Sequence, residues 1–165
     1  MLTESVTQCD AEQVAGLDTL LARYQLKVSL VANNSPIDGS YWGEPEAGLI
    51  EDRLIIRADT PVHSALHEAC HYVCMDQQRR GNLHTDAAGG YDEEDAVCYL
   101  QVLLSDKLPA YSRKRMFADM DAWGYSFRLG SSSAWFNQDA EDARAWLLNH
   151  HLINHEQQPT WLLRQ

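Results

Sequence analysis

The stretch HSALHEACHYVCM, residues 63–75, contains the pattern H-E-x-x-H at His67, Glu68 and His71. Histidines four residues apart lie one turn apart on a helix, so both imidazoles can reach one metal ion at about 2.0–2.1 Å. Glu68 is displaced by one position, where it can take a proton from a water molecule beside that ion. The pattern therefore predicts a zinc site with His67 and His71 as metal ligands and Glu68 as the general base.

The residues around this pattern place it on a helix that packs against a sheet. Thr60 as N-cap and Pro61 in the first helical position favour a helix from Pro61 to about Arg80. An apolar stripe lies beside the histidine stripe on this helix and is suited to face the sheet. The stripe comprises Val62, Leu66, Ala69 and Val73.

Patterns on both sides of this helix indicate an α+β fold. Apolar residues at helical spacing, and alternating runs rich in β-branched residues, predict further helices and strands. The expected helices lie at residues 11–25, 91–109 and 139–153, and the expected strands at 26–32 and within 41–59, with a tight turn at 51–53. No linker or internal repeat divides the chain, so we expect one domain over residues 1–165 with a helical C-terminal half.

A catalytic zinc takes three protein ligands and leaves a position for water. The longer pattern that continues with Gly and His is excluded, because Cys74 and Gln77 occupy those positions. The helix predicted at 91–109 begins with acidic residues. Glu93 shares the apolar stripe of that helix, and Ala96, three positions later, leaves room for close approach. We therefore expect Glu93 to be the third ligand.

Glu94 is the alternative on the same helix, because it lies on a neighbouring stripe. That stripe contains Cys98, Gln101 and Ser105. Two further candidates, His84 and Asp86, stand in the segment before the helix.

The sequences HEACH, at 67–71, and EEDAVCYLQVLL, at 93–104, together resemble the gluzincin clan of zinc metallopeptidases. The chain looks most like its minimal, single-domain members of the ImmA/IrrE type, and the resemblance covers roughly residues 26–109. It implies a zincin-like domain with a small, mostly antiparallel sheet of about three strands against the H-E-x-x-H helix. It also implies Zn²⁺-dependent hydrolysis of a peptide bond, with a peptide or protein as substrate.

The chain departs from the clan at Val97, where members often carry Asp or Asn to orient a metal-bound histidine. We expect that role to fall on Asp92, Asp95 or Asp86. The mechanism also needs a donor for the oxyanion. The candidates are Tyr91, Tyr99, Tyr125, Arg128 and a C-terminal histidine.

Two other parts of the chain have two possible interpretations. The aromatic segment 123–138 is either a wall over the site or a packed loop. His150, His151 and His155 are interpreted as a helix end rather than as a second metal site.

Composition narrows the classes of function. Acidic residues outnumber basic ones by 24 to 13, a net charge of −11, which disfavours a nucleic-acid surface. No apolar run approaches the roughly 20 residues of a membrane span, and residues 1–13 do not resemble a signal peptide. We therefore expect a cytoplasmic protein, with its four cysteines as free, buried thiols. A non-catalytic zinc-binding module is the alternative to an enzyme.

Overall fold

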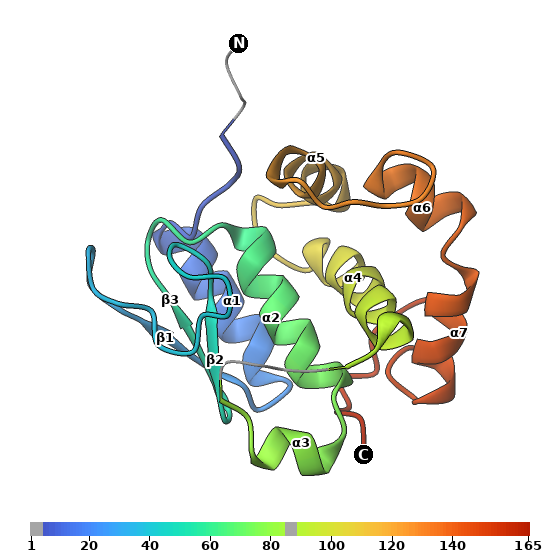
Figure 1. Cartoon of the computed structure of the whole chain (residues 1–165), viewed down its shortest axis with the longest axis horizontal. Coiled ribbons are helices and arrows are strands. Elements are labelled where there is room, and N and C mark those ends of the chain that lie inside the picture. Colours follow the sequence, from blue (N-terminus) through green and yellow to red (C-terminus); the bar gives the residue numbers. More distant parts are fainter. Residues whose placement is uncertain (1–4, 85–88) are drawn as a thin grey trace.

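The computed structural model describes residues 5–84 and 89–165. Within these ranges the chain is α+β, with a small three-stranded sheet and seven helices (Figure 1). The strands are β1 (Lys27–Leu30), β2 (Gly48–Ile50) and β3 (Arg53–Ile56). The helices are α1 (Ala11–Ala22), α2 (Val62–Cys74), α3 (Gln77–Gly81), α4 (Tyr91–Ser105), α5 (Arg113–Trp123), α6 (Ser132–Gln138) and α7 (Glu141–Asn149). None of these helices is long and apolar enough to cross a membrane.

The sheet has the strand order β1-β3-β2 and is mixed. β2 and β3 pair antiparallel across a tight turn at residues 51–52, where a turn was expected. β1 pairs with β3 in parallel, with Val28 opposite Leu54. After the long connection over residues 31–47, β2 starts at the same end of the sheet at which β1 finishes. The tight turn then reverses the chain, so that β3 runs parallel to β1. One of the two pairings is thus parallel, where we expected mostly antiparallel pairing.

Helix α2 lies between the sheet and α4, as Figure 1 shows. One side of α2 packs on β2 and β3, and the other packs along α4. α7 covers the side of α4 that faces away from α2. Two sides of α4 are therefore buried, and nearly all of its side chains from Ala96 to Ser105 are inaccessible to solvent.

The start of α2 differs by one residue from the expected start. Pro61 is the N-cap, and Thr60 instead accepts a hydrogen bond from the main-chain N–H of Arg57 at 2.9 Å. The first amide of the helix, at Val62, donates to the carbonyl of Thr7. The N-terminal segment thus satisfies a group that a helix leaves without an internal partner.

The end of α2 lies at Cys74 rather than near Arg80, because Asp76 starts a new helix. The Asp76 side chain accepts from the amide of Arg79 and caps α3. Two arginines then bind the last carbonyls of α2. Arg80 donates to Tyr72, Val73 and Met75, and Arg164 donates to Val73 and Cys74.

Candidate metal centre

Three side chains from α2 and α4 meet at the contact between these helices. His67 and His71 come from successive turns of α2, and their ring centroids lie 4.8 Å apart. Glu94, in the first turn of α4, places one carboxylate oxygen 3.0 Å from His67 Nε2 and the other 3.0 Å from His71 Nε2. The histidine side chains are 14% and 9% exposed, whereas that of Glu94 is 48% exposed. Two nitrogen donors and a carboxylate of this kind could hold a divalent metal ion.

The orientation of His67 is set by Gln101, two turns after Glu94 on α4. Gln101 is fully buried, and its Nε2 donates to the main-chain carbonyl of His63 at 2.9 Å. Because a carbonyl can only accept, Gln101 Oε1 is the end of the amide that faces His67, 2.9 Å from Nδ1. His67 Nδ1 therefore donates its proton to Gln101, and Nε2 is directed at the centre.

This supporting residue differs from the ones that we expected. Asp92 and Asp95 are exposed on α4, and Asp86 lies outside the described residues. The signal was nevertheless present in the sequence, because Gln101 shares a helical stripe with Glu94. A correct choice of the stripe that faces α2 identifies both residues together.

His71 lacks an equivalent partner. Its Nε2 contacts Glu94, but its buried Nδ1 has no hydrogen-bond partner among the described residues. The two histidines of the motif are therefore supported unequally, His67 by a buried amide and His71 by packing alone.

Glu68 lies beside the two histidines and is buried. Burial raises the pKa of the Glu68 carboxyl, and the nearby His67 and His71 partly offset that rise. A carboxyl whose pKa is shifted toward neutrality is suited to take up a proton and release it again. Glu68 therefore stays a candidate for the general base that the sequence predicts.

The charges at the centre complement one another. Burial alone would lower the pKa of His67, but Tyr125, Cys98 and Glu94 outweigh it, and the pKa lies well above its ordinary value. Burial likewise would raise the pKa of Glu94, but its hydrogen bonds with His67 and His71 outweigh it and hold that pKa low. Both nitrogens of His67 face oxygen acceptors, which fits an imidazolium. A metal ion bound there would take the place of the Nε2 proton.

Glu93, our expected third ligand, is directed away from the histidines, and this corrects the expectation about its orientation. Its buried carboxylate is bound by Arg79 at 2.5 Å and by Arg164 at 2.9 Å. The expectation rests on the apolar stripe that Glu93 shares, but α4 is buried on two sides. An apolar stripe therefore cannot distinguish the side that faces α2 from the side that faces α7. Glu94, the alternative, is the glutamate that reaches the histidines.

One further donor lies at the centre. His67, Glu94 and Cys98 offer donor atoms that all lie within 4.8 Å of one another, and they form the one group of three or more metal-binding side chains found in residues 5–84 and 89–165. His71 is not part of this group, although its Nε2 lies 3.0 Å from the second Glu94 oxygen. Cys98 is 6% exposed and stands one turn after Glu94 on α4.

The remaining candidate ligands stand apart from this group. His84 forms an isolated bridge with Ile50 at the edge of the sheet, and Asp86 lies outside the described residues. At the end of α7, the ring of His150 packs on Trp146 with centroids 4.2 Å apart. In the described part of the chain, the C-terminal histidines join no group that could hold a metal ion.

Two aromatic rings from the end of α5 cover the histidines of α2. The ring of Tyr125 meets those of His63 and His67 edge-on, at 5.4 and 5.7 Å. The ring of Trp123 lies 5.2 Å from that of His63, and its Nε1 donates to Glu46 at 2.7 Å. Because Glu46 lies two residues before β2, this bond joins the end of α5 to the segment that leads into the sheet.

The segment 123–138 thus combines both expected roles. Its first residues form the wall over the histidines. Further along, Phe127 stacks on Trp135 of α6 with centroids 4.7 Å apart, which is packing between a loop and a helix.

Among the expected oxyanion donors, Tyr125 is the one in contact with His67. Tyr91 is 93% exposed at the start of α4. Arg128 forms an ion pair with Asp139. Tyr99 is buried and is directed toward α6 and α7.

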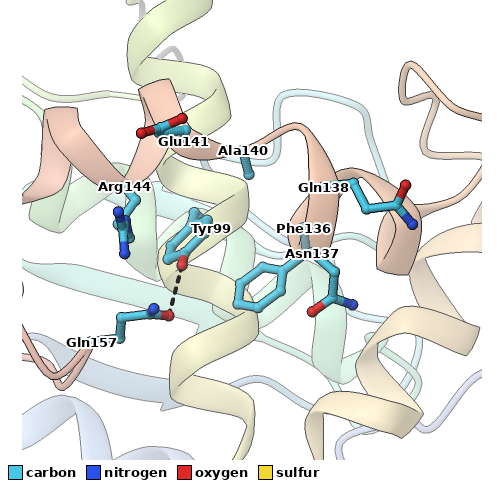
Figure 2. Close-up of a pocket in the computed structure, with 8 residues that line it drawn as sticks. All are labelled: Tyr99, Phe136, Asn137, Gln138, Ala140, Glu141, Arg144 and Gln157. Atoms are coloured by element: carbon cyan, nitrogen blue, oxygen red, sulfur yellow. Dashed lines mark hydrogen bonds between the residues drawn. The ribbon is translucent and has the colours of Figure 1, made fainter.

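Tyr99 belongs to a hollow between α6 and α7, which Figure 2 shows. Its ring stacks on Phe136 with centroids 4.4 Å apart, and its hydroxyl donates to Gln157 at 2.8 Å. The hollow has a volume of about 410 Å³. It is lined by Tyr99, Phe136, Asn137, Gln138, Ala140, Glu141, Arg144 and Gln157. The hydrogen bond and ring contact of Tyr99 thus connect α4 with α6 and the C-terminal segment.

A scan with protein-family models and searches of curated proteins and of solved structures gave no match to this chain. The function is therefore inferred from the geometry and chemistry of the centre.

Proposed function

We propose that the chain is a zinc metallopeptidase whose metal ligands are His67, His71 and Glu94 and whose general base is Glu68. The observation that carries the proposal is the convergence of Glu94 on the Nε2 atoms of both histidines, at 3.0 Å each. Glu94 and Gln101 are far from the motif in sequence, yet Glu94 contacts both histidines and Gln101 contacts His67. A chance H-E-x-x-H pattern on a helix would not be expected to have both contacts.

The donor set fits zinc. Two imidazoles and one carboxylate are a known combination for a catalytic zinc with three protein ligands. The Nε2 atoms of His67 and His71 both face the Glu94 carboxylate, so each histidine presents a ring nitrogen at which a metal ion could replace a proton. Bound there, Zn²⁺ would polarise a peptide carbonyl and lower the pKa of water toward about 7.

The residues of the chain then have separate roles. Glu68 takes a proton from the attacking water and delivers it to the nitrogen of the leaving amine. Gln101 holds His67 in the tautomer that presents Nε2. Tyr125, whose ring meets that of His67, is the candidate donor to the oxyanion; its hydroxyl lies 3.2 Å from His63 Nδ1 and would have to turn toward the metal. Trp123 and Tyr125 also limit the access of bulk water to the centre from the α5 side.

The test is the replacement of the general base without loss of the metal. Glu68→Gln should lower the rate of peptide hydrolysis by about 10²- to 10⁴-fold, because the amide cannot accept the proton. Zinc content, measured by atomic emission, should stay at one ion per chain. Glu12→Gln, at an exposed position of α1, is the matched control and should keep both the rate and the metal. Equal rates in wild type and Glu68→Gln would refute the proposed mechanism.

A second candidate is a non-catalytic zinc-binding module, and Cys98 is the observation that favours it. A fourth protein donor closes the coordination sphere, as in structural zinc sites. Zinc binding without hydrolysis of any peptide in a diverse library, in wild type and Glu68→Gln alike, would favour this module over the peptidase.

A further inference from the structure

We propose that Cys98 is a fourth donor of the centre, so that the metal site has a mixed donor set of two histidines, one glutamate and one cysteine thiolate. The inference rests on the proposed metal site and not on hydrolysis. Four protein donors leave room for water only if the ion accepts a fifth ligand, so a sulfur ligand would favour the zinc-binding module over the peptidase. It makes the site selective for a thiophilic divalent ion such as Zn²⁺, Co²⁺ or Cd²⁺ over Mg²⁺ or Mn²⁺.

The position of Cys98 on α4 carries the inference. Residues four apart lie on the same face of a helix, so Cys98 follows Glu94 toward α2. Its sulfur lies within 4.8 Å of donor atoms of both His67 and Glu94. Gln101, three residues later, continues the same face and contacts His67. This face of α4 is therefore polar along its contact with α2, and Cys98 is part of it.

The other three cysteines have different surroundings. All four are buried and unbridged, as expected from the sequence. Cys70 and Cys74 are fully buried within α2, and Cys9 lies where the chain enters α1. These three belong to no group that could hold a metal ion within the described ranges. They fit the role of small core residues, whereas Cys98 stands between an imidazole and a carboxylate.

The spacing of the donors is close to that of a metal site. Bonds of about 2.0–2.3 Å at tetrahedral angles place donor atoms roughly 3.3–3.8 Å apart. The donor atoms of His67, Glu94 and Cys98 need to approach by about 1 Å, and that of His71, which lies outside this group, must move closer as well. Side-chain rotation supplies both movements. As the ion binds, the Cys98 thiol loses its proton to solvent and the sulfur forms the metal bond.

Cobalt substitution tests the proposal, because a thiolate bound to Co²⁺ gives an intense near-ultraviolet charge-transfer band. Titration of the full chain with Co²⁺ should develop this band to an end point of one ion per chain. Cys9→Ala, the matched control, should keep it. Cys98→Ala should lose the band and still bind Co²⁺, at least about tenfold more weakly, since even an outer partner of a ligand contributes that much.

Binding of Co²⁺ to wild type without the band, or persistence of the band in Cys98→Ala, would overturn the sulfur ligand and leave the proposed peptidase intact. Failure to bind Co²⁺ and Zn²⁺ at all would overturn both. X-ray absorption at the zinc edge of the wild-type protein gives the same answer if Cys98→Ala does not fold. One sulfur at about 2.3 Å is expected, and a shell of nitrogen and oxygen alone would contradict the proposal.

Discussion

Glu93 and Glu94 are neighbours at the start of α4, yet their surroundings are opposite. Glu93 is 6% exposed and is bound by Arg79 and Arg164, which carry a permanent charge. Glu94 is half exposed and meets His67 and His71, whose protons a metal ion can replace. A rotation of about 100° around one helix thus separates a fixed ion-pair cluster from a centre that can exchange its cation.

The two carboxylates have different structural roles. Through Arg164, Glu93 connects the start of α4 to the C-terminal segment, which also binds the last carbonyls of α2. Glu94 makes no bond to that segment in the contacts described above and faces only the centre. We infer that the Glu93 cluster fixes the position of α4, and that Glu94 uses this position to reach the histidines.

The largest expected difference between Glu93 and Glu94 is in zinc affinity, measured in the two alanine variants. Glu94→Ala should weaken zinc binding by at least about 100-fold, or about 2.7 kcal/mol, because it removes a metal ligand. Glu93→Ala should change the affinity little. Competition with a chelator at fixed pH measures both, and circular dichroism verifies that each variant is folded.

The reverse outcome is informative. A loss of affinity confined to Glu93→Ala would mean that the ion pairs with Arg79 and Arg164 give way to metal binding, as the sequence alone suggests. It would remove the contrast between the two residues.

Stability should show the opposite order and a smaller effect. Glu93→Gln should lower the free energy of unfolding by roughly 1–3 kcal/mol, because Arg79 and Arg164 lose their charged partner in a buried place. Glu94→Gln should cost less, because Glu94 is half exposed and the amide oxygen can still accept a hydrogen bond from one of the two histidines. Urea denaturation in the presence of a chelator compares them without metal. Equal losses would show that Glu93 has no special structural role.

The smallest expected effect concerns Gln101, which orients one of the two histidines that Glu94 contacts. Gln101→Leu keeps the size of the side chain but removes the acceptor for His67 Nδ1, so zinc affinity should fall about tenfold. Gln101→Glu restores an acceptor and should recover part of the loss. Wild-type affinity in Gln101→Leu would show that His67 needs no orienting partner.

Local patterns predict the strands and four of the seven helices found in residues 5–84 and 89–165, but they do not locate α3, α5 or α6 separately. The first helix, the three strands, the turn at residues 51–52 and the helices around 62–74 and 91–105 all follow from periodicity and turn residues. The sequence places the end of α2 too late because residues 77–80 are polar residues that a helix tolerates, whereas the capping bond of Asp76 decides the break. Helix α7 begins at Glu141, two residues later than expected, because Asp139 ends α6 and pairs with Arg128.

The candidate centre was predictable in part. The motif identifies His67, Glu68 and His71, because all three lie within one helix. The choice between Glu93 and Glu94 depends on which helix covers which side of α4, and that is a property of the tertiary structure. The pairing of Glu93 with Arg164 joins residues 71 positions apart, and no local pattern indicates it.

The two glycines before α4 show how this arrangement limits sequence change. Gly89 has φ +109°, and a Cβ there would lie 2.2 Å from the Glu93 oxygen that Arg79 holds. A Cβ at Gly90 would meet nothing within 4 Å. Gly89→Ala would force both a strained backbone and a displaced carboxylate, whereas Gly90 can accept other side chains. Among variants of this chain that still fold, Gly89 should therefore be retained, whereas Gly90 should be replaced by many residue types.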